Sequence, residues 1–133
     1  MEECGTIDLE PLKISKYKGL RYFIILNPLL GLNGYAELPE NWKDGKEEYV
    51  EVHGGVTYKG YVRDGKEKVR VIGFDTLHAF DRPEDWPLFR VETECRHSIN
   101  EIIEVMEENE EETEEEQEWN SWKQSKALRD GDL

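Results

Sequence analysis

Nine of the twelve residues from 107 to 118 are glutamate, and this run limits where the chain can build a hydrophobic core. Carboxylates three and four residues apart repel one another along a helix, so this stretch gains no support from its own side chains. Residues 101–133 hold 13 acidic and three basic residues, a net charge of −10, whereas residues 1–100 hold 18 and 14, a net charge of −4. We therefore expect the folded part of the chain to precede residue 107 and to be only mildly acidic.

Upstream of the glutamate run, several short segments are rich in β-branched and aromatic residues, as β-strands are. The apolar segment 21–27 stops at Pro28 and predicts a buried strand. Asp64 and Gly65 are typical of a tight hairpin turn, because such a turn needs positive φ angles. The predicted strands are residues 21–27, 35–38, 49–52, 56–62 and 69–72. The last three of these segments, over residues 49–72, predict a twisted antiparallel meander.

From residue 91 onward the apolar residues recur at helical spacing. They form one stripe, made of Val91, Cys95, Ile99, Ile102, Ile103 and Met106. Such a stripe predicts an amphipathic helix that packs on the sheet. The predicted fold class is therefore α+β, a small twisted antiparallel sheet packed by one C-terminal amphipathic helix. We expect an irregular N-terminal segment over residues 1–20, a single α+β domain over 21–106 and an acidic C-terminal extension over 107–133.

Composition and charge argue against several classes of protein. No stretch approaches the roughly 18–20 apolar residues that span a bilayer, and the acidic N-terminus lacks the features of a signal peptide. The net charge of −14 disfavours a broad nucleic-acid-binding face, and an anionic membrane surface would repel the chain. Cys4 and Cys95 are not expected to form a disulfide, which fits a reducing cytoplasm.

The segment around residue 54 contains the most informative residues. Gly54 and Gly55 let the backbone turn tightly and let a ligand approach without meeting a Cβ atom. His53 would add a titratable ring beside them, and Thr57 and Tyr58 a hydroxyl group and an aromatic face. The plainer interpretation is a hairpin turn with a surface histidine, because Gly-Gly is a common hairpin connection.

A second polar group follows the last predicted strand. Asp75, His78 and Asp81 succeed one another at spacings of three, and with His53 they could form a metal site or an acid–base pair. The plainer interpretation is a turn or a helix cap, since aspartate often follows a strand in that way. Phe80 and Trp86 lie in the same stretch and indicate an ordered functional loop, because linkers seldom carry aromatic residues.

The strong catalytic patterns are absent from the chain. It has no phosphate-binding Gly-x-x-x-x-Gly-Lys loop, no dinucleotide-binding Gly-x-Gly-x-x-Gly and no Gly-x-Ser-x-Gly elbow. His97 lies off the apolar stripe and is interpreted as a surface residue. We therefore favour a binding module without catalytic residues, metal or cofactor over an enzyme.

Two motifs of the chain, taken together, resemble those of a widespread group of small uncharacterised bacteriophage proteins. The motifs are His53-Gly54-Gly55-Val56-Thr57-Tyr58 and Gly73-Phe74-Asp75-x-x-His78, and the resemblance extends over about residues 32–106. It implies a phage origin and a shared pocket formed by the two motifs. Small phage proteins often counter host defence, and one known strategy is a compact oligomer that sequesters a nucleotide signal. This last step is an analogy of class.

The sequence and the resemblance together predict a phage-encoded binding protein that acts in the host-cell cytoplasm. Its partner would be a small anionic or nucleotide-like ligand or a host defence protein, with self-association into a homo-oligomer left open. Glycine N–H groups and imidazoles would contact the ligand, and aromatic rings would stack on a base. The candidate ligand-binding residues are His53, Gly54, Gly55, Thr57, Tyr58, Asp75, His78, Phe80, Asp81 and Trp86.

Two alternatives are kept beside this prediction. A metal-dependent hydrolase or phosphodiesterase would use His53, Asp75 and His78. An inhibitor of a host protein would use the glutamate-rich segment as a mimic of nucleic acid, with a salt-sensitive attraction. For that segment the plainer interpretation is a solvating tail.

Overall fold

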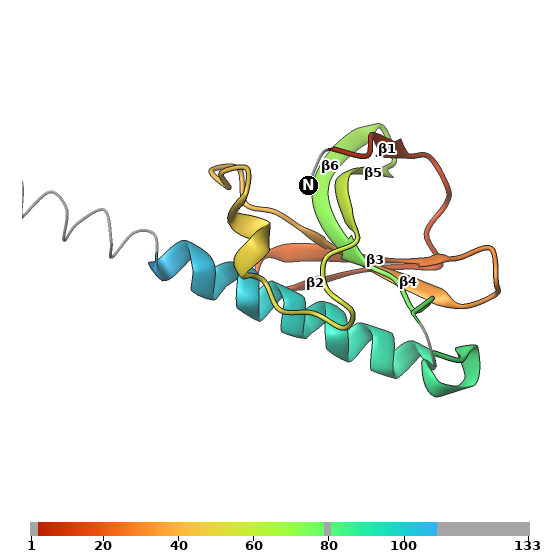
Figure 1. The fold of residues 1–133 in the computed structure, drawn as a ribbon. Coiled ribbons are helices and arrows are strands. Elements are labelled where there is room, and N and C mark those ends of the chain that lie inside the picture. The colour runs from red at the N-terminus through yellow and green to blue at the C-terminus, as the bar shows by residue number, and fades with distance from the viewer. Residues whose placement is uncertain (1–2, 79–80, 109–133) are drawn as a thin grey trace, which may run out of the picture.

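A computed structural model describes residues 3–78 and 81–108 and shows one sheet with one long helix beside it (Figure 1). The strands are β1 Thr6–Ile7, β2 Lys13–Tyr17, β3 Leu20–Leu26, β4 Leu32–Glu37, β5 Tyr58–Asp64 and β6 Glu67–Phe74. Two 3-10 helices, η1 Lys46–Tyr49 and η2 Pro83–Asp85, lie in the connections, and the long helix spans residues 88–108. The predicted α+β class is confirmed. The predicted acidic extension lies outside the described residues from residue 109 onward.

The sheet is mixed. Its strand order is β1-β5-β6-β4-β3-β2, and neighbouring strands are antiparallel except for β1, which runs parallel to β5. The hairpin predicted at Asp64 and Gly65 is confirmed, because β5 and β6 pair from Asp64 opposite Glu67 back to Tyr58 opposite Gly73. The meander predicted over residues 49–72 is present only as this hairpin, because residues 49–52 do not form a strand. On its other side β6 pairs with β4, so the connection between β4 and β5 crosses over.

Two segments differ from the sequence prediction. Residues 1–20 were predicted to be irregular, but β1 and β2 form the two edges of the sheet there. The segment Lys13–Tyr17 is mostly polar and its residues are exposed or only partly buried, so it carries no alternating apolar pattern. Residues 49–52 were predicted to be a strand, but η1 ends at Tyr49 and a loop follows. Val50 is buried in the core, which explains its apolar character without a strand.

The sheet has a hydrophobic cluster on each face. Alternate residues of β3 supply both clusters: Tyr22 and Ile24 face the long helix, and Phe23 and Ile25 face away from it. A strand that is buried on both faces carries a continuous apolar run rather than an alternating one. The curvature of β5 and β6 away from β3 and β4, visible in Figure 1, gives the second cluster its cover.

The helix packs through the stripe predicted for it. Val91, Cys95, Ile99 and Ile102 are fully buried against the sheet. Cys95 is buried, and burial raises the pKa of its thiol. Among residues 3–78 and 81–108, no helix has the length and apolar content needed to cross a bilayer.

Candidate functional site

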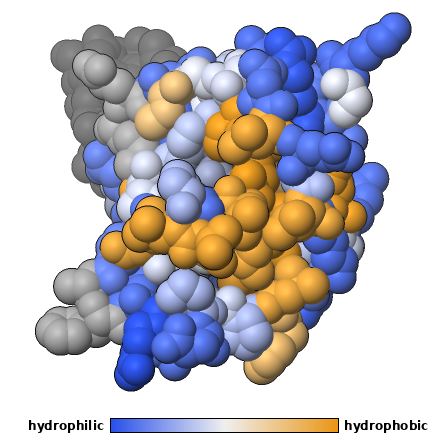
Figure 2. Space-filling model, turned by 90° about the vertical axis from the view of Figure 1, so that its right-hand side faces the viewer, coloured by the Kyte–Doolittle hydropathy of each residue, from blue (hydrophilic) through white to orange (hydrophobic). Residues whose placement is uncertain are grey.

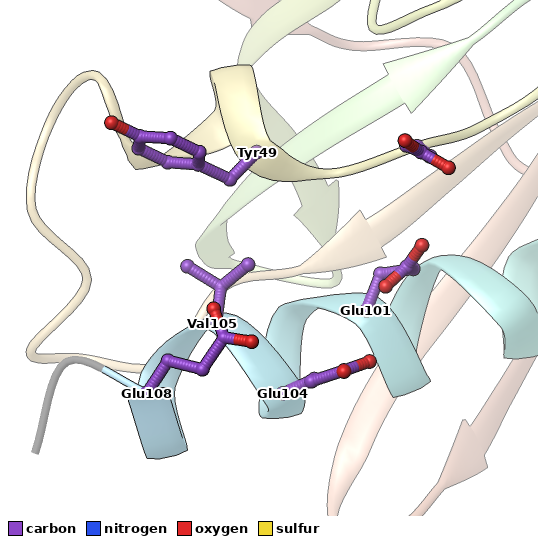
Figure 3. Close-up of a pocket in the computed structure, with 6 residues that line it drawn as sticks. Tyr49, Glu101, Glu104, Val105 and Glu108 are labelled. Carbon is purple, nitrogen blue, oxygen red and sulfur yellow. The ribbon is translucent and has the colours of Figure 1, made fainter. Parts of the chain in front are cut away.

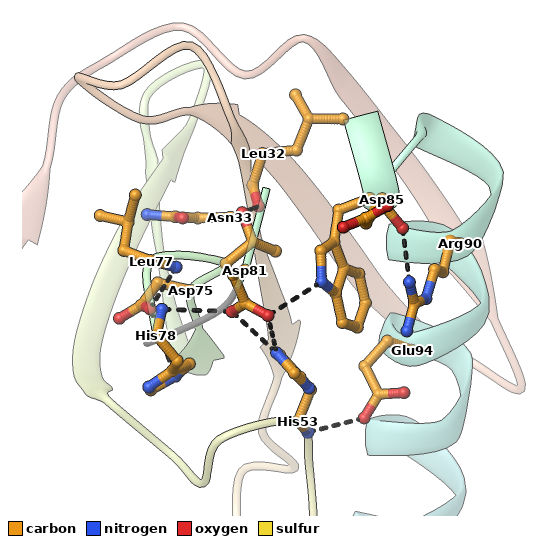
Figure 4. Close-up of polar contacts among 12 residues, drawn as sticks. Leu32, Asn33, His53, Asp75, Leu77, His78, Asp81, Asp85, Arg90 and Glu94 are labelled. Carbon is orange, nitrogen blue, oxygen red and sulfur yellow. Dashed lines mark hydrogen bonds and ion pairs between the residues drawn. The ribbon is translucent and has the colours of Figure 1, made fainter. Parts of the chain in front are cut away.

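The turn at residues 52–55 lies against the loop that precedes the long helix, and Asp81 joins the two (Figure 4). The Nε2 atom of His53 lies 2.9 Å and 3.1 Å from the two carboxylate oxygens of Asp81. The indole N–H of Trp86 donates to the same carboxylate at 3.3 Å, and the backbone N–H of His78 donates to it at 3.1 Å. Asp81 therefore accepts hydrogen bonds from three separate parts of the chain.

These contacts determine the charge of Asp81, whose side chain is only 10% exposed. Burial raises the pKa of this carboxyl group, but the hydrogen bonds from His53, the His78 backbone and Trp86 outweigh burial, and the pKa is lowered overall. Asp81 is thus ionised at neutral pH and acts only as an acceptor. The Nε2 atom of His53 consequently carries the proton and donates, and its Nδ1 atom is the nitrogen left for another partner.

Gly54 allows His78 to sit directly on the backbone of the turn. Gly54 and Gly55 have φ angles of +68° and +83°, in the left-handed region that favours glycine. The N–H of Gly55 donates to the carbonyl of Val52 at 2.9 Å and closes the turn. A Cβ atom on Gly54 would lie 2.0 to 2.6 Å from three atoms of the His78 ring. Only glycine at position 54 leaves room for the imidazole where it stands.

The two imidazoles lie edge to face, with ring centroids 5.6 Å apart and planes at 80°. The side chain of His53 is 29% exposed and that of His78 is 33% exposed. The Nε2 atom of His78 is buried and has no hydrogen-bond partner among the residues that the structure describes. It lies 3.3 Å from Asp75 Oδ1, close enough for an ion pair when protonated but outside hydrogen-bonding geometry. Asp75 Oδ1 instead accepts from the backbone N–H of Leu77 at 3.0 Å.

Trp86 packs against His53 and is almost fully buried. It is 4% exposed, its ring centroid lies 4.2 Å from that of His53, and the guanidinium of Arg90 lies 3.9 Å from its ring. Glu94 accepts a hydrogen bond from the backbone N–H of His53 at 2.8 Å. Arg90 and Glu94 were missed by the sequence analysis. Their signal was available, since they lie four residues apart and each directly precedes a buried residue of the helix stripe.

Several predicted site residues do not join this cluster. The hydroxyl of Tyr58 donates to the carbonyls of Gly5 and Tyr61, and its ring packs on Tyr35 at the face turned away from the helix. The predicted stacking role of Tyr58 beside His53 is therefore wrong. Thr57 is exposed and its N–H donates to the carbonyl of Gly73, so it extends the ladder between β5 and β6.

Three further expectations need comment. Gly55 does not offer its N–H to a ligand, because the carbonyl of Val52 accepts it. Trp86 cannot stack on a base in this arrangement, because it is buried between neighbouring side chains. Phe80 lies outside the described residues, as does most of the glutamate-rich segment predicted as a nucleic-acid mimic.

The polar residues form two pairs and not one ligand set. His53 pairs with Asp81 and His78 lies beside Asp75, and the backbone N–H of His78 links the pairs by donating to the Asp81 carboxylate. In the described part of the chain, no group of three or more histidine, cysteine, aspartate or glutamate residues is arranged to hold a metal ion. The metal-dependent alternative gains no support from this geometry.

A separate acidic cavity lies at the far end of the helix, beside η1 (Figure 3). Its volume is about 340 Å³, and it is lined by Tyr49, Glu51, Glu101, Glu104, Val105 and Glu108. Burial raises the pKa of Glu101, and the neighbouring carboxylates of Glu104 and Glu51 raise it further against the opposing effect of His97. The cavity therefore repels anions, in contrast to the paired imidazoles.

The fold and the cluster together define a small α+β protein with two partly exposed imidazoles in edge-to-face contact, of which His53 is hydrogen-bonded to the buried carboxylate of Asp81. Comparisons with protein-family models, with curated proteins and with solved structures find no match for this chain.

Proposed function

We propose that this chain binds a small anionic or nucleotide-like ligand at His53 and His78. The observation that carries the proposal is the convergence of two histidines from distant segments, with ring centroids 5.6 Å apart and about a third of each side chain exposed. An imidazole backed by a buried carboxylate is a good hydrogen-bond donor for phosphate oxygens. The exposed guanidinium of Arg90 adds a positive charge at the same end of the helix.

Because of the hydrogen bonds of His53, the proposed anion binding requires a proton on its ring. Its Nε2–H is already donated to Asp81, so the neutral ring presents Nδ1 as an acceptor. An anion at Nδ1 needs a donor there, and His53 can donate from both nitrogens only when it is protonated. Anion binding should therefore take up a proton, and the affinity should fall as the pH rises.

The proposed biological role is sequestration of a nucleotide-type signal in the host cytoplasm, as a phage counter-defence protein. This part of the proposal depends on the resemblance to small phage proteins. A sequestering protein needs hydrogen-bond donors and a surface complementary to the ligand, but no nucleophile that attacks it. The arrangement around His53 and His78 supplies the donors.

Calorimetric titration with cyclic nucleotides and with inorganic phosphate tests the proposal. We expect heat of binding for at least one of these probes, and a loss of affinity of tenfold or more in His53→Ala and in His78→Ala. His97→Ala is the matched control, because His97 is exposed and contacts only Glu101, at 3.7 Å. The proposal fails if no probe binds, or if the three variants bind as the wild type does.

A second measurement separates binding from hydrolysis. The ligand is mixed with the protein, released by denaturation and analysed by chromatography. Recovery of intact ligand supports sequestration. Recovery of a cleaved product would replace the proposal with the hydrolase alternative.

A further inference from the structure

Seven large apolar side chains are exposed at the end of the molecule where the long helix begins. They come from the segment before β2, the end of β3 and the loop after it, the loop after β6 and the start of the long helix, and their exposed fractions run from 43% to 76%. They are Leu12, Leu26, Leu29, Leu30, Leu77, Leu88 and Phe89. Figure 2 looks onto this end and shows hydrophobic side chains running together across the face. We call this surface the apolar end.

Backbone and side-chain contacts bring these segments together. The N–H of Leu12 donates to the carbonyl of Ile24, which places the start of β2 beside the end of β3. Lys13 pairs with Glu92, which places the first turns of the helix next to the same strands. The hydroxyl of Thr76 donates to the carbonyl of Leu32, which joins the loop after β6 to the start of β4. Sequence segments far apart therefore meet at one end of the sheet.

The loop between β3 and β4 is built to present its leucines to solvent. The side-chain oxygen of Asn27 accepts hydrogen bonds from the N–H groups of Leu29 and Gly31, and the Asn27 N–H donates to the Gly31 carbonyl. Asn27 is 3% exposed, while Leu29 and Leu30 are 68% and 76% exposed. Leu30 also has a φ angle of +64°, which costs a leucine about 1 kcal/mol or more. An ordered loop thus holds two leucines outward at an energetic cost.

The area of the apolar end exceeds what a monomer ordinarily leaves in water. A fully exposed side chain of this size presents on the order of 200 Å², so the seven together expose roughly 800 Å². Monomeric proteins seldom expose a contiguous apolar patch above about 600 Å². A standard interface between two proteins buries about 800 Å² on each partner. The apolar end is therefore large enough to hold a stable dimer.

The distribution of charge favours a second copy of this chain as the occupant. The acidic cavity lies at the opposite end of the helix, and residues 88–108 separate the two ends by about 30 Å. The charges that border the apolar end are of both signs, with Lys13 beside Glu92 and Arg82 beside Asp85. Two acidic chains can approach through this end while their most negative parts point away from each other.

We propose that the apolar end is the interface of a homodimer with a two-fold axis, in which each copy buries Leu30 and Phe89 against the other. A two-fold contact uses the same patch on both copies and closes the assembly at two chains. Leu77 belongs to the patch and precedes His78 in the chain, so the interface adjoins the two imidazoles. This inference is independent of what those imidazoles bind.

Sedimentation equilibrium of the full chain tests the interface. We expect twice the monomer mass of 15.7 kDa for the wild type. Leu30→Glu and Phe89→Glu should each weaken the dimer by tenfold or more, because a buried carboxylate without a partner is costly. Tyr49→Glu is the matched control, since Tyr49 is 65% exposed but lies at the acidic end. It adds the same charge and should leave the dimer intact.

In the single chain the substituted side chains are largely in solvent, so both variants should unfold in urea with the same midpoint as wild-type protein diluted until it is monomeric. A wild type that remains monomeric up to its solubility limit would overturn the inference and leave the apolar end to a different partner. A dimer that neither variant weakens would show that the copies meet elsewhere. An assembly that grows beyond two chains would exclude the two-fold contact.

Discussion

Gly54→Ala and Gly55→Ala form a matched pair that isolates the contact between the turn and His78. Both glycines have positive φ angles, so either substitution costs about 1–2 kcal/mol of backbone strain. A Cβ atom on Gly55 meets nothing within 4 Å, whereas one on Gly54 lies 2.0 Å from the Nε2 atom of His78. Gly54→Ala must therefore also displace the imidazole, at a further cost of about 1–3 kcal/mol.

Urea unfolding followed by tryptophan fluorescence measures both costs, and the side-chain NMR signals of His78 report its displacement. We expect Gly54→Ala to lower the free energy of unfolding by more than Gly55→Ala and to shift the His78 ring signals. Gly55→Ala should leave those signals in place. Equal losses of stability, or unchanged His78 signals in Gly54→Ala, would refute the packing of His78 on Gly54.

Three further predictions concern stability. Asp81→Asn should lower the free energy of unfolding by about 2–4 kcal/mol at neutral pH, because it weakens the hydrogen bonds from the three donors. Since the pKa of Asp81 is lowered, its stabilisation is present above the ordinary aspartate pKa and is lost as the pH falls. The urea unfolding curves of the wild type and the variant should therefore converge in acid. Lys59→Met should lower the free energy of unfolding by about 3–5 kcal/mol, because it removes the ammonium group that lies 3.0 Å from Glu47, which is 3% exposed. In urea unfolding, the double variant with Glu47→Met should recover part of that loss. His78→Phe should be neutral or stabilising in the same assay, because it removes a buried nitrogen that has no hydrogen bond, yet it should abolish anion binding in the titration. A clear loss of stability in His78→Phe would assign His78 a structural role instead.

The parts of the fold that follow from local pattern were predictable. The hairpin is indicated by the two turn residues Asp64 and Gly65 alone. The long helix is indicated by the helical spacing of the apolar stripe from Val91 to Ile102. The edge strands β1 and β2 were not predictable in this way, because β1 has only two residues and β2 is mostly polar. Likewise the buried Val50 has the same apolar character in a loop as it would have in a strand.

In the candidate site, too, some contacts could be predicted from the sequence and others depend on long-range structure. That His53 and His78 would come together was expected from their motifs, and the distance between their rings agrees with that expectation. The register of β5 against β6 decides which face of the sheet the Tyr58 side chain takes, and therefore which residues it contacts. That register cannot be predicted from composition. The contact of Glu94 with His53 depends on where the helix lies across the sheet, a long-range property.

The hydrogen bonds of this cluster distinguish a structural role from a binding role for each residue. Asp81 has its acceptor capacity used by three donors and Trp86 is buried, so both have the environment expected of residues that hold the loop to the helix. His78 differs, because its buried Nε2 atom has no hydrogen bond and position 54 must remain glycine to accommodate its ring. Leaving a buried polar atom unpaired costs about 1–3 kcal/mol, which an apolar side chain at position 78 would avoid. A histidine at that cost is better explained by what its ring can bind than by what it contributes to the fold.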